Sequence, residues 1–209
     1  MATSGEPAAR GGPLYCCGSG TAAAGRRALL QGSLAVALAP LGRLALADEA
    51  EDAASKRPQV GDMFVDMSAS DSTKPLTPGD VKQDEPVLGW PLDPATKKPR
   101  DGSRFNMVLL VRVDPSKMIP DEAPHIAEGV AGFSAICTHQ QCPVSGWEKD
   151  RQVLLCPCHQ SEYDPNQNAK VVGGPAPRPL PALPLKIENG ALLVAGPFIG
   201  RVGGETGAG

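Results

Sequence analysis

Short apolar runs separated by glycine, proline and polar residues dominate the chain, most clearly after residue 104. The longest run, Phe105–Val113, is followed by Asp114-Pro115, and it predicts a buried strand. The sequence Glu188-Asn189-Gly190 predicts the turn of a hairpin. Many short strands of this kind indicate an all-β fold, either an antiparallel sandwich or a barrel. Shorter runs predict the remaining strands at residues 63–65, 87–90, 130–136, 152–155, 170–172, 183–187 and 192–194.

The composition agrees with such a fold. The chain has 209 residues, of which 41% are hydrophobic, and this suits one core of ordinary size plus appendages. The 24 glycines and 22 prolines favour short strands and ordered loops over long helices. The net charge is -3, but residues 1–47 hold four arginines and one glutamate, so the remainder is more acidic. This balance argues against nucleic-acid binding and suits a basic or neutral protein partner.

The N-terminal region has the pattern of an export signal. Twin arginines, Arg26 and Arg27, come directly before a run rich in alanine and leucine, and residues 45–47 offer a small-residue cleavage site. We therefore predict a twin-arginine signal peptide over residues 1–47, followed by a flexible acidic tether over residues 48–58. The apolar run is shorter than the ~20 residues that span a bilayer. The alternative is an uncleaved N-terminus that serves as a short membrane anchor.

Most residues that could bind a soft metal lie close together in the sequence. Four of the six cysteines and two of the three histidines fall between residues 137 and 164. They include two short motifs, Cys137-x-His139 and Cys156-x-x-His159. Two thiolates and two imidazoles suit either a tetrahedral zinc ion or an iron–sulfur cluster in which histidines replace cysteines on one iron. Zinc modules more usually carry paired Cys-x-x-Cys motifs, but the residues alone leave both occupants open.

The two motifs, separated by residues 140–155, resemble the cluster-binding motif of Rieske proteins. The resemblance implies a [2Fe-2S] cluster as the cofactor. It places Cys137 and Cys156 on one iron, and His139 and His159 on the other. A structural zinc module then becomes the least favoured alternative.

Two further cysteines, Cys142 and Cys158, match the positions that form a disulfide in the high-potential branch of the Rieske family. An oxidising destination outside the cytoplasm also favours their pairing over two free buried thiols. Gln141 and Gln160 depart from the family pattern, because respiratory Rieske subunits usually have glycine at both positions. The resemblance therefore implies a Cys142–Cys158 disulfide between two loops with unusual residues.

Residues after the second motif extend the resemblance. Ser161 and Tyr163 match a serine and a tyrosine whose hydroxyl groups, in the family, donate to cluster sulfur atoms, and the tyrosine donates to the cysteine that corresponds to Cys137. Such bonds stabilise the reduced cluster, so the resemblance implies a high redox potential. The run Gly174-Pro175-Ala176-Pro177 resembles a proline-rich loop that shields the cluster.

The resemblance covers residues 105–202 and implies a domain organisation. We expect an all-β Rieske domain over residues 59–205, an antiparallel sandwich or barrel, with a small cluster-binding subdomain at about residues 136–178. A Rieske domain carries single electrons, and we expect no catalytic acid, base or nucleophile of its own.

The expected role is that of an exported electron-transfer subunit, in the periplasm or at the outer face of the bacterial cytoplasmic membrane. The prediction that we favour is a subunit resembling the small subunit of arsenite oxidase, whose partner is a molybdopterin enzyme. The alternative is the Rieske subunit of a quinol–cytochrome c reductase (cytochrome bc complex), with cytochromes b and c1 as partners. In both cases a cytochrome c or a similar protein would accept the electrons.

Overall fold

The computed structural model describes residues 53–69, 73–114, 116–118 and 125–204. The predicted signal peptide and the first part of the predicted tether lie outside these residues. All of the described residues belong to one compact unit. Within them, no helix has both the length and the apolar character needed to cross a bilayer.

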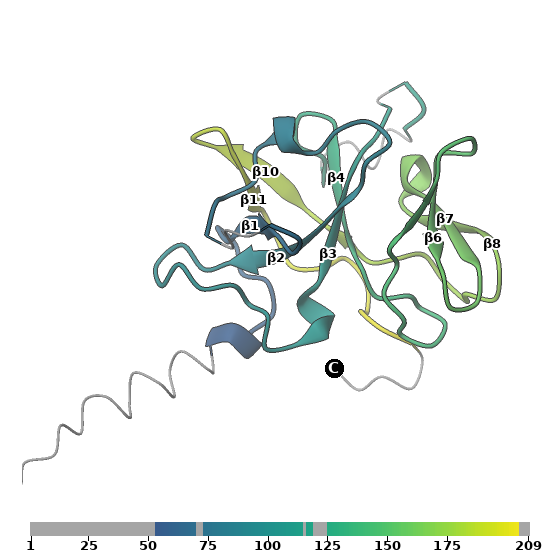
Figure 1. Cartoon of the computed structure of the whole chain (residues 1–209), viewed down its shortest axis with the longest axis horizontal. Helices are drawn as coiled ribbons and strands as arrows, with labels where there is room; N and C mark the ends of the chain where they lie inside the picture. Colours follow the sequence, from purple (N-terminus) through teal and green to yellow (C-terminus); the bar gives the residue numbers. More distant parts are fainter. Residues whose placement is uncertain (1–52, 70–72, 115, 119–124, 205–209) are drawn as a thin grey trace, which may run out of the picture. The chain divides into compact units, whose positions relative to one another are not determined.

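Seven short strands form one antiparallel sheet, and most of them are labelled in Figure 1. Its strand order is β10-β11-β1-β2-β3-β4-β9. The strands at the two ends of this order, β9 and β10, are separated in the sequence only by Pro184, so the sheet is nearly closed into a barrel. The strands are β1 (Met63–Asp66), β2 (Val87–Leu92), β3 (Val108–Arg112), β4 (Val130–Ser134), β9 (Ala182–Leu183), β10 (Leu185–Glu188) and β11 (Ala191–Val194).

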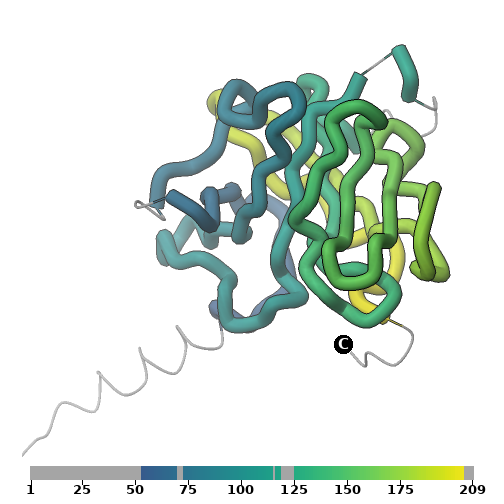
Figure 2. Tube along the Cα trace, turned by 45° about the vertical axis from the view of Figure 1, so that its right-hand side comes forward, coloured from purple at the N-terminus to yellow at the C-terminus, as the bar shows by residue number. Residues whose placement is uncertain are grey.

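A second antiparallel sheet has four strands in sequence order. In Figure 2 the green tube of residues 146–173 folds back on itself as consecutive hairpins. Its strands are β5 (Gly146–Glu148), β6 (Val153–Cys156), β7 (Ser161–Asp164) and β8 (Lys170–Gly173). In the part of the chain that the structure describes, short 3-10 helices interrupt the connections between consecutive strands: η1 (Pro78–Asp80), η2 (Arg104–Asn106) and η4 (Pro165–Gln167).

The continuous apolar run of β3 is explained by burial on both faces. Side chains alternate across a strand, so Leu109 and Val111 point to one side and Val108 and Leu110 to the other. Leu109 and Val111 pack in a core that includes Leu154 of the second sheet. Val108 and Leu110 pack in a separate core inside the large sheet. A strand between two cores has no polar face, which confirms the predicted buried strand.

The structure agrees with most predicted strands and differs in informative places. β3 begins at Val108, because Arg104–Asn106 forms a 3-10 turn instead of extended chain. The run at 183–187 is divided at Pro184, which lacks an amide hydrogen for the ladder. β5 and β7 were not predicted, because both are short and rich in polar residues. The predicted hairpin turn joins β10 and β11, and Asn189 and Gly190 both have positive φ.

Candidate metal centre

Two loops of similar construction carry the predicted ligands. The first follows β4, and the N–H of Gln141 donates to the carbonyl of Cys137 at 3.0 Å. The second joins β6 to β7, and the N–H of Gln160 donates to the carbonyl of Cys156 at the same distance. We call residues 137–142 the first ligand loop and residues 156–160 the second ligand loop. In each, a cysteine begins a tight turn that the amide four residues later closes.

The two glutamines that depart from the Rieske pattern both adopt a glycine-like conformation. Gln141 has a φ of 61° and Gln160 a φ of 59°, in the left-handed region. This region disfavours residues with a Cβ atom and is open to glycine. The turn geometry therefore explains why glycine suits these positions, and it shows that this chain builds the same turns with a larger residue.

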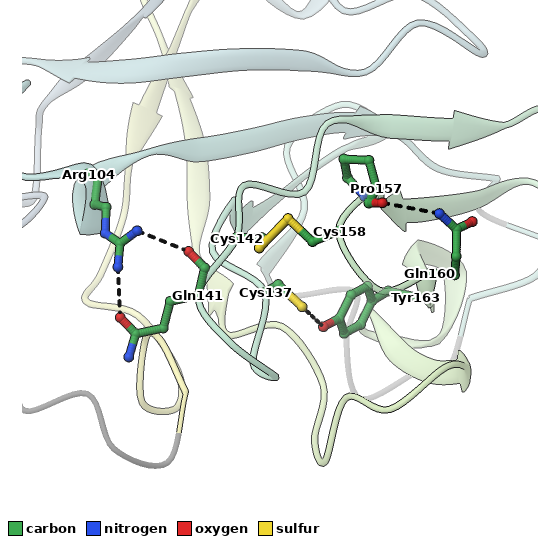
Figure 3. Close-up of a disulfide and its surroundings, with 8 residues drawn as sticks. All are labelled: Arg104, Cys137, Gln141, Cys142, Pro157, Cys158, Gln160 and Tyr163. Carbon is green, nitrogen blue, oxygen red and sulfur yellow. Dashed lines mark hydrogen bonds between the residues drawn. A yellow bond between two sulfur atoms is a disulfide. The ribbon is translucent and has the colours of Figure 1, made fainter. Parts of the chain in front are cut away.

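A disulfide between Cys142 and Cys158 links the two loops (Figure 3), as predicted. The bond closes a loop of 16 residues, which stabilises a folded protein by about 3 kcal/mol in the chain-entropy estimate. The Sγ atoms of Cys142, Cys156 and Cys158 lie within 4.8 Å of one another, a grouping that could suggest a three-thiolate metal site. Since two of these sulfurs are bonded to each other, only Cys156 retains a free thiol.

The four predicted ligands divide into a buried pair and a more accessible pair. Cys137 and Cys156 are buried, free thiols. The rings of His139 and His159 meet edge to face, with their centroids 4.7 Å apart. His139 is half-buried and His159 is exposed. Two thiols therefore lie at the inner side of the loops, and two imidazoles meet toward the surface.

Burial favours the neutral thiol of Cys156. It raises the pKa of this thiol, and the adjacent Cys137 thiol raises that pKa further, because two thiolates side by side would repel each other. A bound cation reverses this preference by stabilising both thiolates. The thiol of Cys156 therefore favours its protonated form unless a cation binds beside it.

Tyr163 lies beneath the first ligand loop, fully buried, with its hydroxyl 3.2 Å from the Sγ of Cys137 (Figure 3). The same hydroxyl accepts a hydrogen bond from the N–H of Thr138 at 3.3 Å. Burial raises the pKa of Tyr163, and the neighbouring Cys137 raises it further. The phenol therefore stays protonated and can donate to a sulfur at the position of the Cys137 Sγ.

The run resembling the shielding loop packs against the second ligand loop. A Cβ atom on Gly174 would lie 2.4 Å from the carbonyl oxygen of Gln160, and Gly174 has a φ of +78°. Only glycine fits this close backbone contact. Pro175 and Pro177 are exposed, and Ala176 between them is buried.

The first ligand loop has further supports that the sequence motifs did not indicate. Arg104 donates to the carbonyl of Gln141 at 3.3 Å and to its side-chain oxygen at 3.0 Å. A Cβ atom on Gly204 would lie 2.9 Å from the carbonyl of His139, so the C-terminal segment passes directly against this loop. Arg178 donates to the carbonyls of Arg201 and Gly203 in that segment.

Comparisons with known proteins agree with this geometry. A model of the Rieske [2Fe-2S] domain family matches residues 107–184. The cytochrome bc1 complex Rieske iron-sulfur subunit of Streptomyces lividans is 31% identical over 147 residues, which are 68% of this chain and 85% of that protein. This chain belongs to the Rieske family.

Other Rieske relatives match shorter parts of the chain. The cytochrome bc1 complex Rieske iron-sulfur subunit of Corynebacterium diphtheriae is 44% identical over 105 residues, 47% of this chain and 26% of that protein. A putative respiratory nitrate reductase Rieske subunit of Haloferax mediterranei is 38% identical over 108 residues, 51% of this chain and 48% of that protein. The chain thus spans about a quarter of the first relative's length and about half of the second's.

Among solved structures, the cyanobacterial plasma membrane Rieske protein from Synechocystis is 26% identical, with a TM-score of 0.38. That match covers 57% of this chain and 95% of the Synechocystis chain.

The Rieske cofactor is a [2Fe-2S] cluster, and the residues at the two loops fit it. Of the four buried side-chain polar atoms without a hydrogen-bond partner among the described residues, two belong to this site, Oγ of Ser161 and Nδ1 of His139. An unpaired buried hydroxyl destabilises a fold by about 1–3 kcal/mol. A cluster between the loops would offer a sulfur acceptor to Ser161 and an iron to Nδ1 of His139, so both atoms would gain partners.

Proposed function

We propose that Cys137 and Cys156 bind one iron of the [2Fe-2S] cluster and that His139 and His159 bind the other. The observation that carries this proposal is the division into two buried thiols and two imidazoles that meet at the surface. A cluster held in this way supplies one-electron oxidation and reduction. The protein residues exclude water from the thiolate side and leave the imidazole side open to a redox partner.

We further propose that the centre belongs to the high-potential Rieske branch. Reduction adds negative charge to the cluster and its sulfurs, so a hydroxyl donor stabilises the reduced form more than the oxidised form. Tyr163 lies within reach of the Cys137 sulfur, and Ser161 has an unpaired buried hydroxyl directly after the second ligand loop. The Cys142–Cys158 disulfide also matches that branch.

The partner that we propose is a quinol-oxidising cytochrome bc1-type complex. The Streptomyces and Corynebacterium relatives are subunits of such complexes, and they support this alternative better than the arsenite-oxidase-like role favoured by the sequence motifs. The exposed imidazole of His159 can accept a hydrogen bond from a quinol hydroxyl through a ring nitrogen that does not bind iron. The Haloferax relative supports a second candidate, a Rieske subunit of another respiratory reductase.

Purification of the full chain from its own membranes tests the cofactor and the partner together. We expect iron and acid-labile sulfide in equal amounts, the electron paramagnetic resonance signal of a reduced [2Fe-2S] centre after dithionite, and co-purified haem of the b and c types. Zinc without that signal would refute the proposed cofactor. Co-purified molybdenum instead of haem would assign the chain to a molybdopterin enzyme.

Export by the twin-arginine route is also part of the proposal. It is supported by Arg26 and Arg27 ahead of an apolar run, and a cluster assembled before export needs a folded protein around it. The variant Arg26→Lys/Arg27→Lys should leave the unprocessed chain in the cytoplasm. Normal processing and normal location of this variant in cell fractions would contradict the export proposal.

A further inference from the structure

A cationic side chain from outside the first ligand loop holds it at one residue. Arg104 of η2 reaches Gln141 at two points, the main-chain carbonyl and the side-chain oxygen (Figure 3). The guanidinium of Arg104 also lies over the ring of Phe105, 5.1 Å from its centroid. Arg57 lies over the same ring at 5.5 Å. Arg104 is thus directed by the ring of its neighbour toward the loop.

The residue that Arg104 holds is the one that closes the turn. The N–H of Gln141 donates to the carbonyl of Cys137, and Gln141 directly precedes the disulfide-bonded Cys142. The closed turn therefore contains both proposed ligands of this loop, Cys137 and His139. Any change in the backbone at Gln141 therefore moves the hydrogen-bonded turn that carries these two ligands.

Gln141 needs this support because its backbone lies in the left-handed region, with a φ of 61°. Glycine adopts this conformation freely, whereas glutamine is strained in it. An arginine presents several N–H donors in a rigid plane, so it can hold two acceptors of one residue at once. The bonds to both oxygens of Gln141 offset the strain.

The second ligand loop offers an internal comparison. Gln160 has the same turn geometry, with a φ of 59°, and its N–H closes the turn to Cys156. Its side chain donates to the carbonyl of Pro157, within the same loop, at 3.2 Å (Figure 3). Among the described hydrogen bonds, no side chain from outside the loop reaches Gln160. A side chain from outside the loop therefore bonds the positive-φ glutamine in the first ligand loop and not in the second.

We propose that Arg104 is a positioning residue for the first ligand loop. It holds Gln141 in the conformation that glycine would adopt unaided, and thereby fixes His139 relative to His159. Arg104 and Gln141 act as a pair, so that glycine at position 141 makes the arginine dispensable. The proposal rests on the ligand set given under the proposed function.

Four proteins test the pair: the wild type, Arg104→Ala, Gln141→Gly and the double variant. In Arg104→Ala we expect chelator-induced bleaching of the cluster about fivefold faster, which corresponds to about 1 kcal/mol, with altered g-values in the electron paramagnetic resonance spectrum. Gln141→Gly alone should bleach at the wild-type rate. The double variant should recover both the wild-type rate and the wild-type g-values.

The double variant separates positioning from charge. Removal of the Arg104 charge should lower the midpoint potential in both Arg104→Ala and the double variant, since a nearby cation favours the reduced form. Bleaching and g-values should recover only if the arginine acts through Gln141. Equal bleaching rates in Arg104→Ala and the double variant, both faster than in the wild type, would overturn the proposal. Wild-type behaviour of Arg104→Ala would overturn it as well.

A matched control comes from the second ligand loop. Gln160→Gly should change the bleaching rate by the same factor in the wild type and in the Arg104→Ala variant, because Arg104 does not contact Gln160. If the effects on the bleaching rate were as strongly coupled between positions 104 and 160 as between 104 and 141, Arg104 would not act through Gln141 alone, and the proposal would be contradicted. If the wild type holds zinc, the proposed function fails. The rate of zinc release to a chromogenic chelator, measured in the same four proteins, would then still decide whether Arg104 positions the loop.

Discussion

The two ligand loops have the same backbone turn and opposite surroundings. The first is packed from several sides, by the hydroxyl of Tyr163, by Arg104 and by the C-terminal segment at Gly204. In the second, residues 157–160 are all exposed, including His159. The disulfide is the covalent connection between them.

This difference separates two tasks that a redox centre must combine. The packed loop keeps one thiol and one imidazole in place, because its backbone contacts the rest of the fold at several points. The exposed loop leaves His159 open to a partner, and its geometry depends on the disulfide and on the close approach of Gly174. The second loop should therefore be the more sensitive to changes at these two supports.

The largest effect should follow removal of the disulfide. Cys142→Ser/Cys158→Ser should lower the free energy of unfolding by about 3 kcal/mol. In hydrogen exchange, the amide of Gln160 should lose much more protection than the amide of Gln141, because only the first loop keeps its other supports. Equal loss of protection at the two amides would show that the loops are held alike.

A smaller effect is expected from Gly174→Ala. The new Cβ would lie 2.4 Å from the backbone of the second ligand loop, so loop and neighbour must move apart, and we expect a loss of roughly 2 kcal/mol in denaturant unfolding. Gly190→Ala is the control, since Gly190 has a φ of +80° but nothing within 4 Å of a Cβ atom. If both variants lost the same free energy of unfolding, backbone strain at a positive φ, and not the close contact, would explain the result.

The two hydroxyl groups both lie on β7 but serve different ligand loops, since Tyr163 contacts Cys137 of the first and Ser161 directly follows the second, so they should tune the potential separately. Tyr163→Phe and Ser161→Ala should each lower the midpoint potential by roughly 40 to 90 mV, from about 1 to 2 kcal/mol per hydrogen bond and 59 mV per tenfold change. Protein-film voltammetry on both variants measures the shifts. Unchanged midpoints in both would remove the hydroxyl explanation of a high potential.

The smallest effect concerns the surface of the second sheet. Arg151 donates to both carboxylate oxygens of Glu162, at 2.7 and 2.6 Å, and holds the pKa of Glu162 below its ordinary value of 4.5. A lowered folded-state pKa stabilises the fold above pH 4.5, and this stabilisation is lost as the pH falls through the folded-state value. Thermal melts of wild type and Glu162→Gln should differ slightly at pH 7 and converge as the pH falls below the lowered folded-state pKa. A difference that persists at low pH would exclude the ion pair as its cause.

The sequence predicted the chemistry of the centre better than its supports. Cysteine and histidine spacing carries the ligand motifs, and the resemblance to the high-potential Rieske branch implied the Cys142–Cys158 disulfide that the structure contains. Arg104 comes 37 residues before Gln141, and no local pattern connects the two. Likewise, Gly204 follows the last predicted strand, and only the folded chain shows its approach to His139.

Strand prediction succeeded where burial was continuous and failed where it was mixed. The run in β3 was evident because both faces are buried. β7 alternates buried Ser161 and Tyr163 with half-buried Glu162 and Asp164, and such a polar strand has no apolar run to detect. Its inward side chains carry the hydroxyl groups that we propose donate to the cluster, and such polar side chains hide the strand from a search for apolar runs.

The burial of β3 on both faces has a consequence for how the molecule unfolds. One strand supplies alternate side chains to the core of the large sheet and to the core that it shares with the four-stranded sheet. Neither core can open without loosening that strand, so the domain should melt as a single cooperative unit. Damage far from the iron site would then release iron through global unfolding, with no intermediate in which the ligand-bearing hairpins detach on their own.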